Sequence, residues 1–581
     1  MSVGQNKAKR LRLLSLITSL CSFALISAVS VYAQNSSSDS SKATISGTVI
    51  NAITRAPIAR ALVSSPDSRY AMLTDSAGRF EFEMDGETPG PSIPAAGIGG
   101  NATYPSTVQT WLTARKPGYL SDGESGALAV SGQEATIALT PEALIVGRIS
   151  FSTPETTSTV TVQLFARQVQ DGLPRWTQQA SATTNAAGEF RFADLHAGSY
   201  RLSTTESLDN DPGAMISRSQ VYGFPPVYYP NATDFSTAGT IEVSPGQTVQ
   251  ADLALLRQPY YQVRIPVNGD MSGGINVVVS PQGHRGPGYS LGPNIAEHRI
   301  EGLLPNGTYV VDAISYGENS ASGTANLRVA GGPAEGTTLS MVPNSGVVLN
   351  VKEEFSTQTQ SATGDMTITA MGGPGGGTRS HPIRGPRAYL QATLESADDF
   401  GSGMQVTLRQ PKGPNDDSLV LDNVPPGHYW LRLYPGMHGY AASAMMGAVD
   451  LLHQPLTVTT GSGGQIDITM RDDFASVEGT VSGPNTAAST SNPYSSTVWV
   501  YFVPLPDSSG QPTQTGVGPD GHFGTLEIVP GNYRVLAFPR VRQDLPYRDP
   551  QAMKAYETKG QVIHVAPGQK ANLQLQLSSE D

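Results

Sequence analysis

The feature that most restricts the fold of this 581-residue chain is a short pattern that recurs along it. Alternating, mostly apolar residues lead to a further apolar residue and then to Gly-x-Tyr in segments 190–200, 419–429 and 523–533. Segment 298–309 fits with one extra residue, which we place in the loop. Period-two alternation is typical of a strand with one buried face, and Ala-Gly, Pro-Gly or Asn-Gly predicts a tight turn. Each copy therefore predicts a hairpin of strand, turn and strand.

The tyrosine at the end of each copy has a predicted role in packing. Tyr200, Tyr309, Tyr429 and Tyr533 each enter the second strand with a large apolar ring. Their hydroxyl groups are placed to bond back to the backbone of the preceding loop, as in the tyrosine corner of immunoglobulin-like sandwiches. We expect all four rings to be buried.

Further shared segments bound a larger unit around each copy. Opening strands contain Gly47, Gly147 and Gly479, and closing strands follow Ser-Pro-Gly at 244–246 and Ala-Pro-Gly at 566–568. Strand and turn signals that alternate with almost no helical periodicity predict an all-β fold. Each unit has the size of an ordinary domain. The predicted units are 43–141, 142–258, 259–344, 345–473 and 474–578, of which 345–473 carries a long glycine-rich loop.

The connections between these units suggest an extended molecule. The joints are only a few residues long, so we expect neighbouring units to abut in a semi-rigid rod on the order of 150 Å long. Segments 87–107 and 356–387 interrupt the strand pattern, and we expect long solvated loops there. The one helix candidate is 549–557, where Asp549 is a suitable cap and Pro550 a suitable first residue.

The N-terminus has the pattern of an export signal. Four basic residues precede an apolar run at 13–31, and Val31 and Ala33 supply the small residues that signal peptidase requires. We interpret 1–33 as a signal peptide cleaved after Ala33, with an uncleaved anchor as the alternative. The single cysteine, Cys21, lies inside it, so the mature chain has no cysteine for a disulfide or a thiolate site. We expect a secreted, periplasmic or cell-surface protein with no later membrane-spanning segment.

Net charge restricts the partners. The chain has 49 acidic and 37 basic side chains and a formal charge of −12. This balance provides no basic surface for a phosphate backbone, so nucleic acid is excluded as a partner.

The first unit carries a family resemblance. Residues 45–49 (Ile-Ser-Gly-Thr-Val), 57–63 (Pro-Ile-Ala-Arg-Ala-Leu-Val) and 74–80 (Thr-Asp-Ser-Ala-Gly-Arg-Phe) together resemble the carboxypeptidase regulatory-like domain, a transthyretin-like β-sandwich. Residues 116–119 (Lys-Pro-Gly-Tyr) match the later Gly-Tyr strand entry of that family.

This resemblance covers 43–139 well, 142–256 and 474–577 less well, and the region between them weakly. It implies a seven-stranded, carbohydrate-binding-like fold, shared with starch-binding-like modules and often repeated in bacterial surface proteins. It implies no catalytic residues, because the sandwich is an accessory domain in the namesake peptidases. The predicted fold class is all-β, with tandem immunoglobulin/transthyretin-like β-sandwiches after an N-terminal signal peptide.

Two enzyme motifs have structural explanations. His298 and Glu301 have the spacing of carboxypeptidase zinc ligands, with His428 as a third candidate. The repeat register instead gives His298 the strand position of Phe190 and places His428 between the glycine and tyrosine of its copy. Ser290 lies in Gly-x-Ser-x-Gly, but prolines flank this motif and no helical pattern follows, as a nucleophile elbow would need.

Other motifs are also weak. The Gly97-x-Gly99 motif and the glycine run 372–377 lack a strand-loop-helix context, so we interpret both as loops. Asp209 and Asp211 supply too few oxygens for a calcium site and are expected in a solvated turn. We assign no catalytic, cofactor-binding or metal-binding residue and no cofactor.

Aromatic residues leave one question open, because each ring either packs in a core or offers a flat surface to a ligand such as a sugar. The residues concerned are Tyr222, Phe224, Tyr228, Tyr229, Trp430, Tyr434, Trp499 and Tyr501.

Three hypotheses follow. The leading one is a non-catalytic exported protein that acts as a structural or interaction module of the cell envelope, in adhesion or as a scaffold. The second is a carbohydrate-binding protein that uses exposed aromatic rings. The third is a hydrolase or an accessory subunit of an exported enzyme. The expected partners are polysaccharide or envelope proteins.

Overall fold

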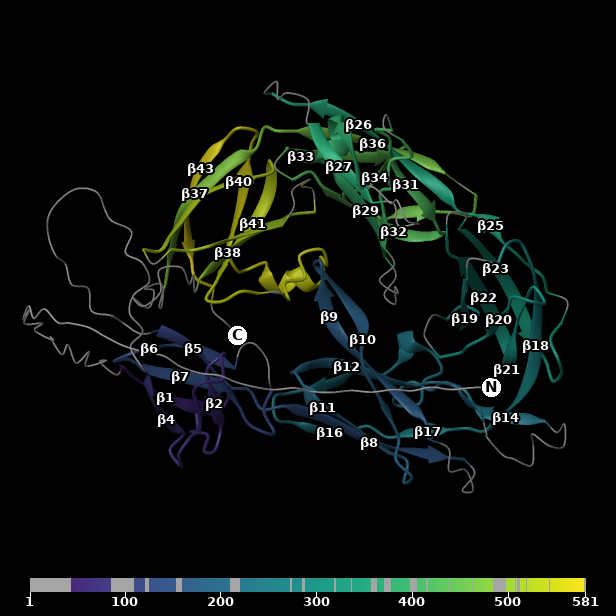
Figure 1. Cartoon of the computed structure of the whole chain (residues 1–581), viewed down its shortest axis with the longest axis horizontal. Coiled ribbons are helices and arrows are strands. Elements are labelled where there is room, and N and C mark those ends of the chain that lie inside the picture. Colours follow the sequence, from purple (N-terminus) through teal and green to yellow (C-terminus); the bar gives the residue numbers. More distant parts are fainter. Residues whose placement is uncertain are drawn as a thin grey trace, which may run out of the picture.

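The computed structural model shows a chain of tandem all-β sandwiches (Figure 1). It describes residues 43–578 except 85–108, 121–124, 153–158, 209–219, 272–273, 285–287, 318–319, 336, 357–362, 370–377, 398–404, 414–415, 437, 462, 484–497, 507, 509–511, 519 and 543. The proposed signal peptide and Cys21 therefore lie outside the described residues. We number the sandwiches 1 to 5 along the chain.

Sandwich 1 packs a three-stranded sheet on a four-stranded sheet. The first sheet, in the order β4-β1-β7, contains β1 (Ala43–Asn51), β4 (Arg79–Met84) and β7 (Glu134–Leu139). The second, in the order β3-β2-β5-β6, contains β2 (Leu62–Ser64), β3 (Ala71–Leu73), β5 (Gln109–Arg115) and β6 (Gly126–Val130).

Sandwich 2 has a long hairpin in its second sheet. The first sheet contains β8 (Ala143–Phe151), β11 (Glu189–Leu195), β16 (Thr248–Gln250) and β17 (Leu253–Leu255). The second, in the order β10-β9-β12-β15, contains β9 (Thr161–Gln170), β10 (Leu173–Thr183), β12 (Gly198–Thr204) and β15 (Ile241–Val243). A short 3-10 helix, η1 (Phe235–Thr237), precedes β15.

Sandwich 3 shares a sheet with the chain that leads into it, because β14 pairs with its first strand, β18. This sheet contains β13 (Ser207–Leu208), β14 (Val221–Phe224), β18 (Gln258–Asn268), β20 (Gly292–Asn294), β21 (Arg299–Pro305) and β24 (Leu339–Ser340). The opposite sheet contains β19 (Ile275–Pro281), β22 (Gly307–Ser315), β23 (Ala321–Val329) and β25 (Val342–Pro343).

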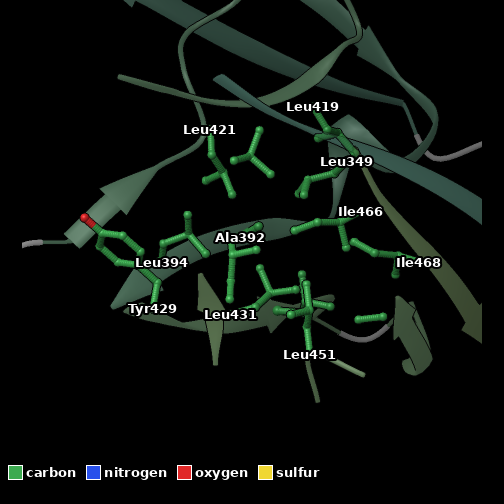
Figure 2. Close-up of a cluster of buried hydrophobic side chains, with 14 of the residues drawn as sticks. Leu349, Ala392, Leu394, Leu419, Leu421, Tyr429, Leu431, Leu451, Ile466 and Ile468 are labelled. Carbon is green, nitrogen blue, oxygen red and sulfur yellow. The ribbon is translucent and has the colours of Figure 1, made fainter. Parts of the chain in front are cut away.

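Sandwich 4 has the largest core cluster, of which Figure 2 shows a part. One sheet contains β26 (Ser345–Glu354), β31 (Leu419–Val424), β33 (Tyr440–Met446), β34 (Val449–Asp450) and β36 (Gly464–Arg471). The other contains β29 (Gln391–Ser396), β30 (Gln405–Thr407), β32 (Gly427–Tyr434) and β35 (Leu456–Val458). Side chains from both sheets, such as Leu421 and Leu431, meet between them.

The long loop expected at 356–387 is partly wrong. Two strands pair within it as a hairpin, and a 3-10 helix follows them. These elements are β27 (Thr363–Thr369), β28 (Thr378–Arg384) and η2 (Gly385–Ala388). Five of the seven positions in β27 are polar or small, so the apolar pattern that predicts a strand is weak there.

Sandwich 5 closes the described chain. One sheet, in the order β40-β37-β43, contains β37 (Ala475–Ser482), β40 (His522–Ile528) and β43 (Lys570–Gln576). The other, in the order β39-β38-β41-β42, contains β38 (Trp499–Pro504), β39 (Thr513–Gly516), β41 (Gly531–Phe538) and β42 (Gln561–Val565). A 3-10 helix, η3 (Ala552–Tyr556), lies between β41 and β42.

All five sandwiches use the same pairing of their first strand. This strand pairs antiparallel with one strand and parallel with the closing strand, as β37 does with β40 and β43. The equivalent sets are β1 with β4 and β7, β8 with β11 and β16, β18 with β21 and β24, and β26 with β31 and β36.

The recurring pattern forms an arch between two sheets, so the prediction of a hairpin is wrong. In sandwich 2, β11 and β12 flank the predicted turn but belong to opposite sheets. The same holds for β21 and β22, β31 and β32, and β40 and β41. Period-two alternation marks a buried face but not a pairing partner, which explains the error.

The tyrosine prediction is confirmed in all four copies. The rings of Tyr200, Tyr309, Tyr429 and Tyr533 are at most 4% exposed. Each hydroxyl donates a hydrogen bond to the carbonyl oxygen four residues earlier, over 2.8, 3.0, 2.9 and 2.6 Å respectively. Ring and hydroxyl together hold the arch against the core.

The extra residue of the third-sandwich copy lies in a strand, which corrects its placement in the loop. β21 pairs with β18 from Arg299 to Pro305 without a register shift. The equivalent strands β11, β31 and β40 each have an irregularity at this point. Asp194 and Asn423, with φ of 54° and 59°, lie in two of these irregularities. Regular pairing in β21 uses one more residue to reach the same turn.

The expectation of an extended rod is wrong. The sandwiches follow an arc, and sandwich 5 returns to the β9–β10 hairpin of sandwich 2 (Figure 1). This hairpin has strands of 10 and 11 residues, and its tip contacts residues of sandwiches 4 and 5. Short joints do not prevent curvature when a long hairpin bridges the ends of the arc.

Candidate functional site at the junction of three sandwiches

The tip of the β9–β10 hairpin is a two-residue turn formed by Asp171 and Gly172. Gln170 pairs with Leu173 directly beside it. Asp171 and Gly172 have φ of 48° and 76°, as both central residues of a type I′ turn require. This turn places the carboxylate of Asp171 at the end of the hairpin.

Asp171 forms ion pairs and a hydrogen bond with two other sandwiches. Arg432, on β32 of sandwich 4, contacts its carboxylate. From sandwich 5, Arg548 lies 3.3 Å away, and the hydroxyl of Tyr547 donates a hydrogen bond. Arg432 is 7% exposed and also donates from Nε to Glu395 over 3.1 Å. A buried guanidinium with two carboxylate partners satisfies the rule that buried charges are paired.

Backbone and ring contacts reinforce this junction. The backbone N–H of Arg548 donates to the carbonyl oxygen of Gly172 over 2.9 Å. The ring of Tyr547 covers Gly172 so closely that a Cβ there would lie 2.6 Å from it. Farther along β10, the guanidinium of Arg175 donates to the carbonyl oxygen of Ser396 over 2.9 Å. Burial raises the pKa of Tyr547, as does its bond to Asp171, so the phenol stays protonated.

A cavity of about 630 Å³ opens beside these contacts. Residues 430–434 of β32 all line it, and Leu431 and Leu433 also belong to the core of sandwich 4. The opposite wall comes from sandwich 5, including the 504–506 segment and Met553 of η3. Asp171 completes the cavity from sandwich 2.

The predicted helix at 549–557 lies in this wall, as a 3-10 helix at Ala552–Tyr556. Asp549 Oδ1 accepts from the backbone N–H groups of Gln551 and Ala552, over 2.9 and 3.1 Å. Asp549 therefore accepts bonds from the backbone at the start of the helix, but the helix begins later than expected and its cap residue is Gln551.

The structure separates the aromatic residues that the sequence left open. Phe224, Tyr228 and Tyr501 are at most 6% exposed. Trp499 packs against a hydrophobic cluster of sandwich 5, and Tyr229 against the core of sandwich 2. Tyr222 lies 4.0 Å from the guanidinium carbon of Arg257. Trp430 and Tyr434 line the junction cavity, and Tyr434 is 52% exposed.

The three zinc-ligand candidates have separate surroundings. His298 is exposed with φ of 48°, so the prediction that it takes the place of Phe190 is wrong. Glu301 pairs with Arg299 over 2.5 Å. His428 is exposed and lies 3.1 Å from the hydroxyl of Thr457. Within the described ranges, His, Cys, Asp and Glu side chains form no group of three that could hold a metal ion.

Ser290 lies two residues before β20, with no helix directly after it. Its backbone N–H donates to Glu206 over 3.4 Å. Asp209, Asp211, Gly97, Gly99 and the 372–377 run lie outside the described residues, so their interpretation as loops and turns stays a prediction.

Sequence reasoning missed the residues that organise the junction. Asp171-Gly172 between two alternating segments is a strong hairpin signal and could have been found. Tyr547 and Arg548 have no such signal, because their partner Asp171 is more than 300 residues away in sequence.

Comparisons with known proteins identify no family. No family model matches the sequence, and no curated protein matches it either. The resemblance to the carboxypeptidase regulatory-like domain therefore stays a prediction. Within the described part of the chain, no helix combines the length and apolar character needed to cross a bilayer.

Solved structures that include pilins are similar at low identity. The Bacillus anthracis TIE protein is 9% identical to this chain, with a TM-score of 0.14. The match covers 74% of this chain and 68% of the TIE protein. BcpA, the major pilin subunit of Bacillus cereus, is 9% identical, with a TM-score of 0.14. The match covers 57% of this chain and 99% of BcpA. The RrgB pilus protein from Streptococcus pneumoniae is 8% identical, with a TM-score of 0.13. The match covers 76% of this chain and 99% of RrgB. Such scores carry no functional argument.

Proposed function

We propose that this chain is a non-catalytic exported protein that acts as a structural or interaction module of the cell envelope. The supporting observation is that the recurring tyrosine side chains have a structural role. All four recurring tyrosines are buried and bond to their own arches, so the repeat serves to build successive sandwiches. The leader pattern at 1–33 supports export.

The junction at Asp171 supports a scaffold role. It joins sandwiches 2, 4 and 5 through ion pairs, a tyrosine hydroxyl and a backbone hydrogen bond. These contacts hold the arc in one shape, which a module that presents surfaces at set positions requires. Domain boundaries at 141, 258, 344 and 473 are part of this proposal.

The proposal is tested by fractionation and by assays on the purified chain. We expect the protein outside the cytosol with a mass that lacks residues 1–33, and we expect Ala33→Lys to block this processing. We expect no peptidase or esterase turnover and no stoichiometric zinc. Retention in the cytosol would overturn export. Turnover that His298→Ala or Ser290→Ala abolishes would favour a hydrolase instead.

Carbohydrate binding is the second candidate function. It is favoured by the position of Trp430 and Tyr434, two aromatic residues that line one cavity next to charged side chains.

A further inference from the structure

The junction cavity has the size and position of a ligand site. Its volume of about 630 Å³ falls in the range of roughly 300 to 1,000 Å³ that small-molecule sites occupy. Sites of this kind are also frequent at interfaces between domains. Here the walls come from sandwiches 2, 4 and 5, so the cavity exists only in the closed arc.

Positive charge is concentrated around this cavity in an otherwise acidic protein. Arg432, Arg534, Arg548 and Lys554 line it, against the carboxylates of Asp171 and Glu557. The whole chain carries a formal charge of −12. A local excess of cations in a concave surface attracts anions. The charge distribution therefore favours an acidic ligand.

Several of these cations have donors left for a ligand. Arg534 donates from Nη1 to the carbonyl oxygens of Tyr556 and Glu557, over 3.2 and 2.6 Å, and not to a carboxylate. Lys554 is exposed and, among the described residues, forms no ion pair. Buried Arg432 lies at ion-pair distance from Asp171, but its Nη2 is not aligned for a hydrogen bond. Guanidinium groups match the geometry of a carboxylate.

Aromatic rings supply the second kind of contact. Trp430 and Tyr434 follow one face of β32, and Tyr547 faces the same cavity from sandwich 5. The faces of aromatic rings carry partial negative charge and therefore attract the weakly positive C–H groups of a sugar ring. The guanidinium of Arg432 lies 5.9 Å from the Trp430 ring, so stacking and charge recognition are available at one place.

We propose that the junction cavity binds a short acidic oligosaccharide. Trp430 and Tyr434 stack on its sugar rings, while Arg534 and Lys554 bind its carboxylate. This proposal rests on the interaction role proposed above and gives that role a ligand class.

An acidic peptide is the alternative, and the cavity suits it less well. A peptide that adds to a sheet needs a free strand edge. β32 pairs with β29 over Tyr429–Tyr434 but with β35 only over Gly427–Tyr429, so its second edge is unpaired beside residues 430–434. A peptide at that edge would face the wall from sandwich 5. Four prolines in the wall, Pro504, Pro506, Pro512 and Pro550, have no N–H to donate to peptide carbonyls.

The test is calorimetric titration of the full mature chain with three probes. These are trigalacturonic acid, the neutral trisaccharide with its carboxylates reduced to alcohols, and triglutamate. We expect saturable binding of the acidic saccharide and binding of the neutral one weaker by roughly tenfold or more. Equal affinity for both saccharides, or tighter binding of triglutamate, would overturn the proposal, as would no binding of any probe.

Variants locate the binding to the cavity. Trp430→Ala and Tyr434→Ala should each weaken binding of trigalacturonic acid by roughly threefold to tenfold, the range of a lost ring contact. Lys554→Gln should weaken it by roughly threefold and reduce its salt dependence. Matched controls are Trp111→Ala, which removes a 46% exposed tryptophan from sandwich 1, and Lys570→Gln on β43.

The controls should bind like the wild type. Equal losses in the cavity variants and the controls would place the ligand elsewhere and overturn the site. Tyr434 is half exposed, so its variant keeps the test valid even if Trp430→Ala destabilises the fold. Export and turnover are measured in separate assays, so failure of binding here leaves the proposed scaffold function intact.

Discussion

The Cζ atom of Phe523 lies 2.8 Å from the position that a Cβ on Gly479 would occupy. These two residues pair across β37 and β40. The same contact occurs in sandwich 1, where Phe80 Cζ lies 2.5 Å from the corresponding position at Gly47, its cross-strand partner. An aromatic ring thus covers the glycine of the opening strand, which explains why this position has no side chain.

Gly479→Ala should therefore destabilise sandwich 5. The added methyl group meets the Phe523 ring and the carbonyl oxygen of Leu573, and overpacking of this kind costs about 1 to 3 kcal/mol. Differential scanning calorimetry of the full chain measures the effect. Gly524→Ala is the control, because its Cβ would meet no atom within 4 Å. Equal stability of the two variants would contradict the packing argument.

The arch tyrosines allow ring and hydroxyl to be separated. Tyr429→Phe removes the hydrogen bond to the Pro425 carbonyl and should cost about 1 kcal/mol in the free energy of unfolding. Tyr429→Ala also removes the buried ring and should cost about 3 to 5 kcal/mol. Chemical denaturation measures both values. Tyr434→Phe, at a half-exposed position of the same strand, should leave stability unchanged. If Tyr429→Phe lost as much free energy of unfolding as Tyr429→Ala, the hydroxyl rather than the ring would dominate.

Asp171→Asn tests whether the hairpin tip closes the arc. Asparagine keeps the left-handed turn conformation but loses the charge that binds Arg432 and Arg548. Small-angle scattering should show a larger radius of gyration than that of the wild type. Asp544→Asn, at an exposed carboxylate that pairs with Arg542, should leave the radius unchanged.

Gly172→Ala gives a second way to open the junction without a change in charge. Its Cβ would collide with the Tyr547 ring, and its φ of 76° disfavours a side chain. A radius of gyration that stays at the wild-type value in both junction variants would show that other contacts hold the arc.

Glu206, which lies where sandwiches 2 and 3 meet, should make the stability of the protein depend on pH. Burial raises the pKa of Glu206 to about 7, and its surroundings include Tyr260 and the backbone N–H of Ser290. Because the folded state holds this proton more tightly than the unfolded state, the stabilisation is complete below pH 4.5 and is lost as pH rises through 7.

The free energy of unfolding falls by at most about 3 kcal/mol, as calculated from the size of the Glu206 pKa shift. Thermal unfolding at pH 5 and pH 8 should show a larger decrease for the wild type than for Glu206→Gln. Exposed Glu527→Gln should behave like the wild type. The opposite sign, with stability rising between these pH values because of Glu206, would contradict its burial.

Local chemistry determined much of this protein from sequence alone. Alternation marked the buried strand faces, and Gly-x-Tyr predicted the buried rings and their hydroxyl bonds, because the partner carbonyl lies four residues away. The bond from the Gln551 backbone to Asp549 was predictable for the same reason. Interactions of short sequence separation leave a pattern in the sequence.

Only the tertiary structure decided which sheet each strand joins and how the sandwiches meet. Alternation is the same for a hairpin and for an arch, so the division of β11 and β12 between two sheets was not predictable. The contact of Tyr547 with Asp171 spans 376 residues. No local sequence pattern at either residue indicates the other as its partner. Their contact depends on the lengths and relative angles of all the strands and sandwiches between them.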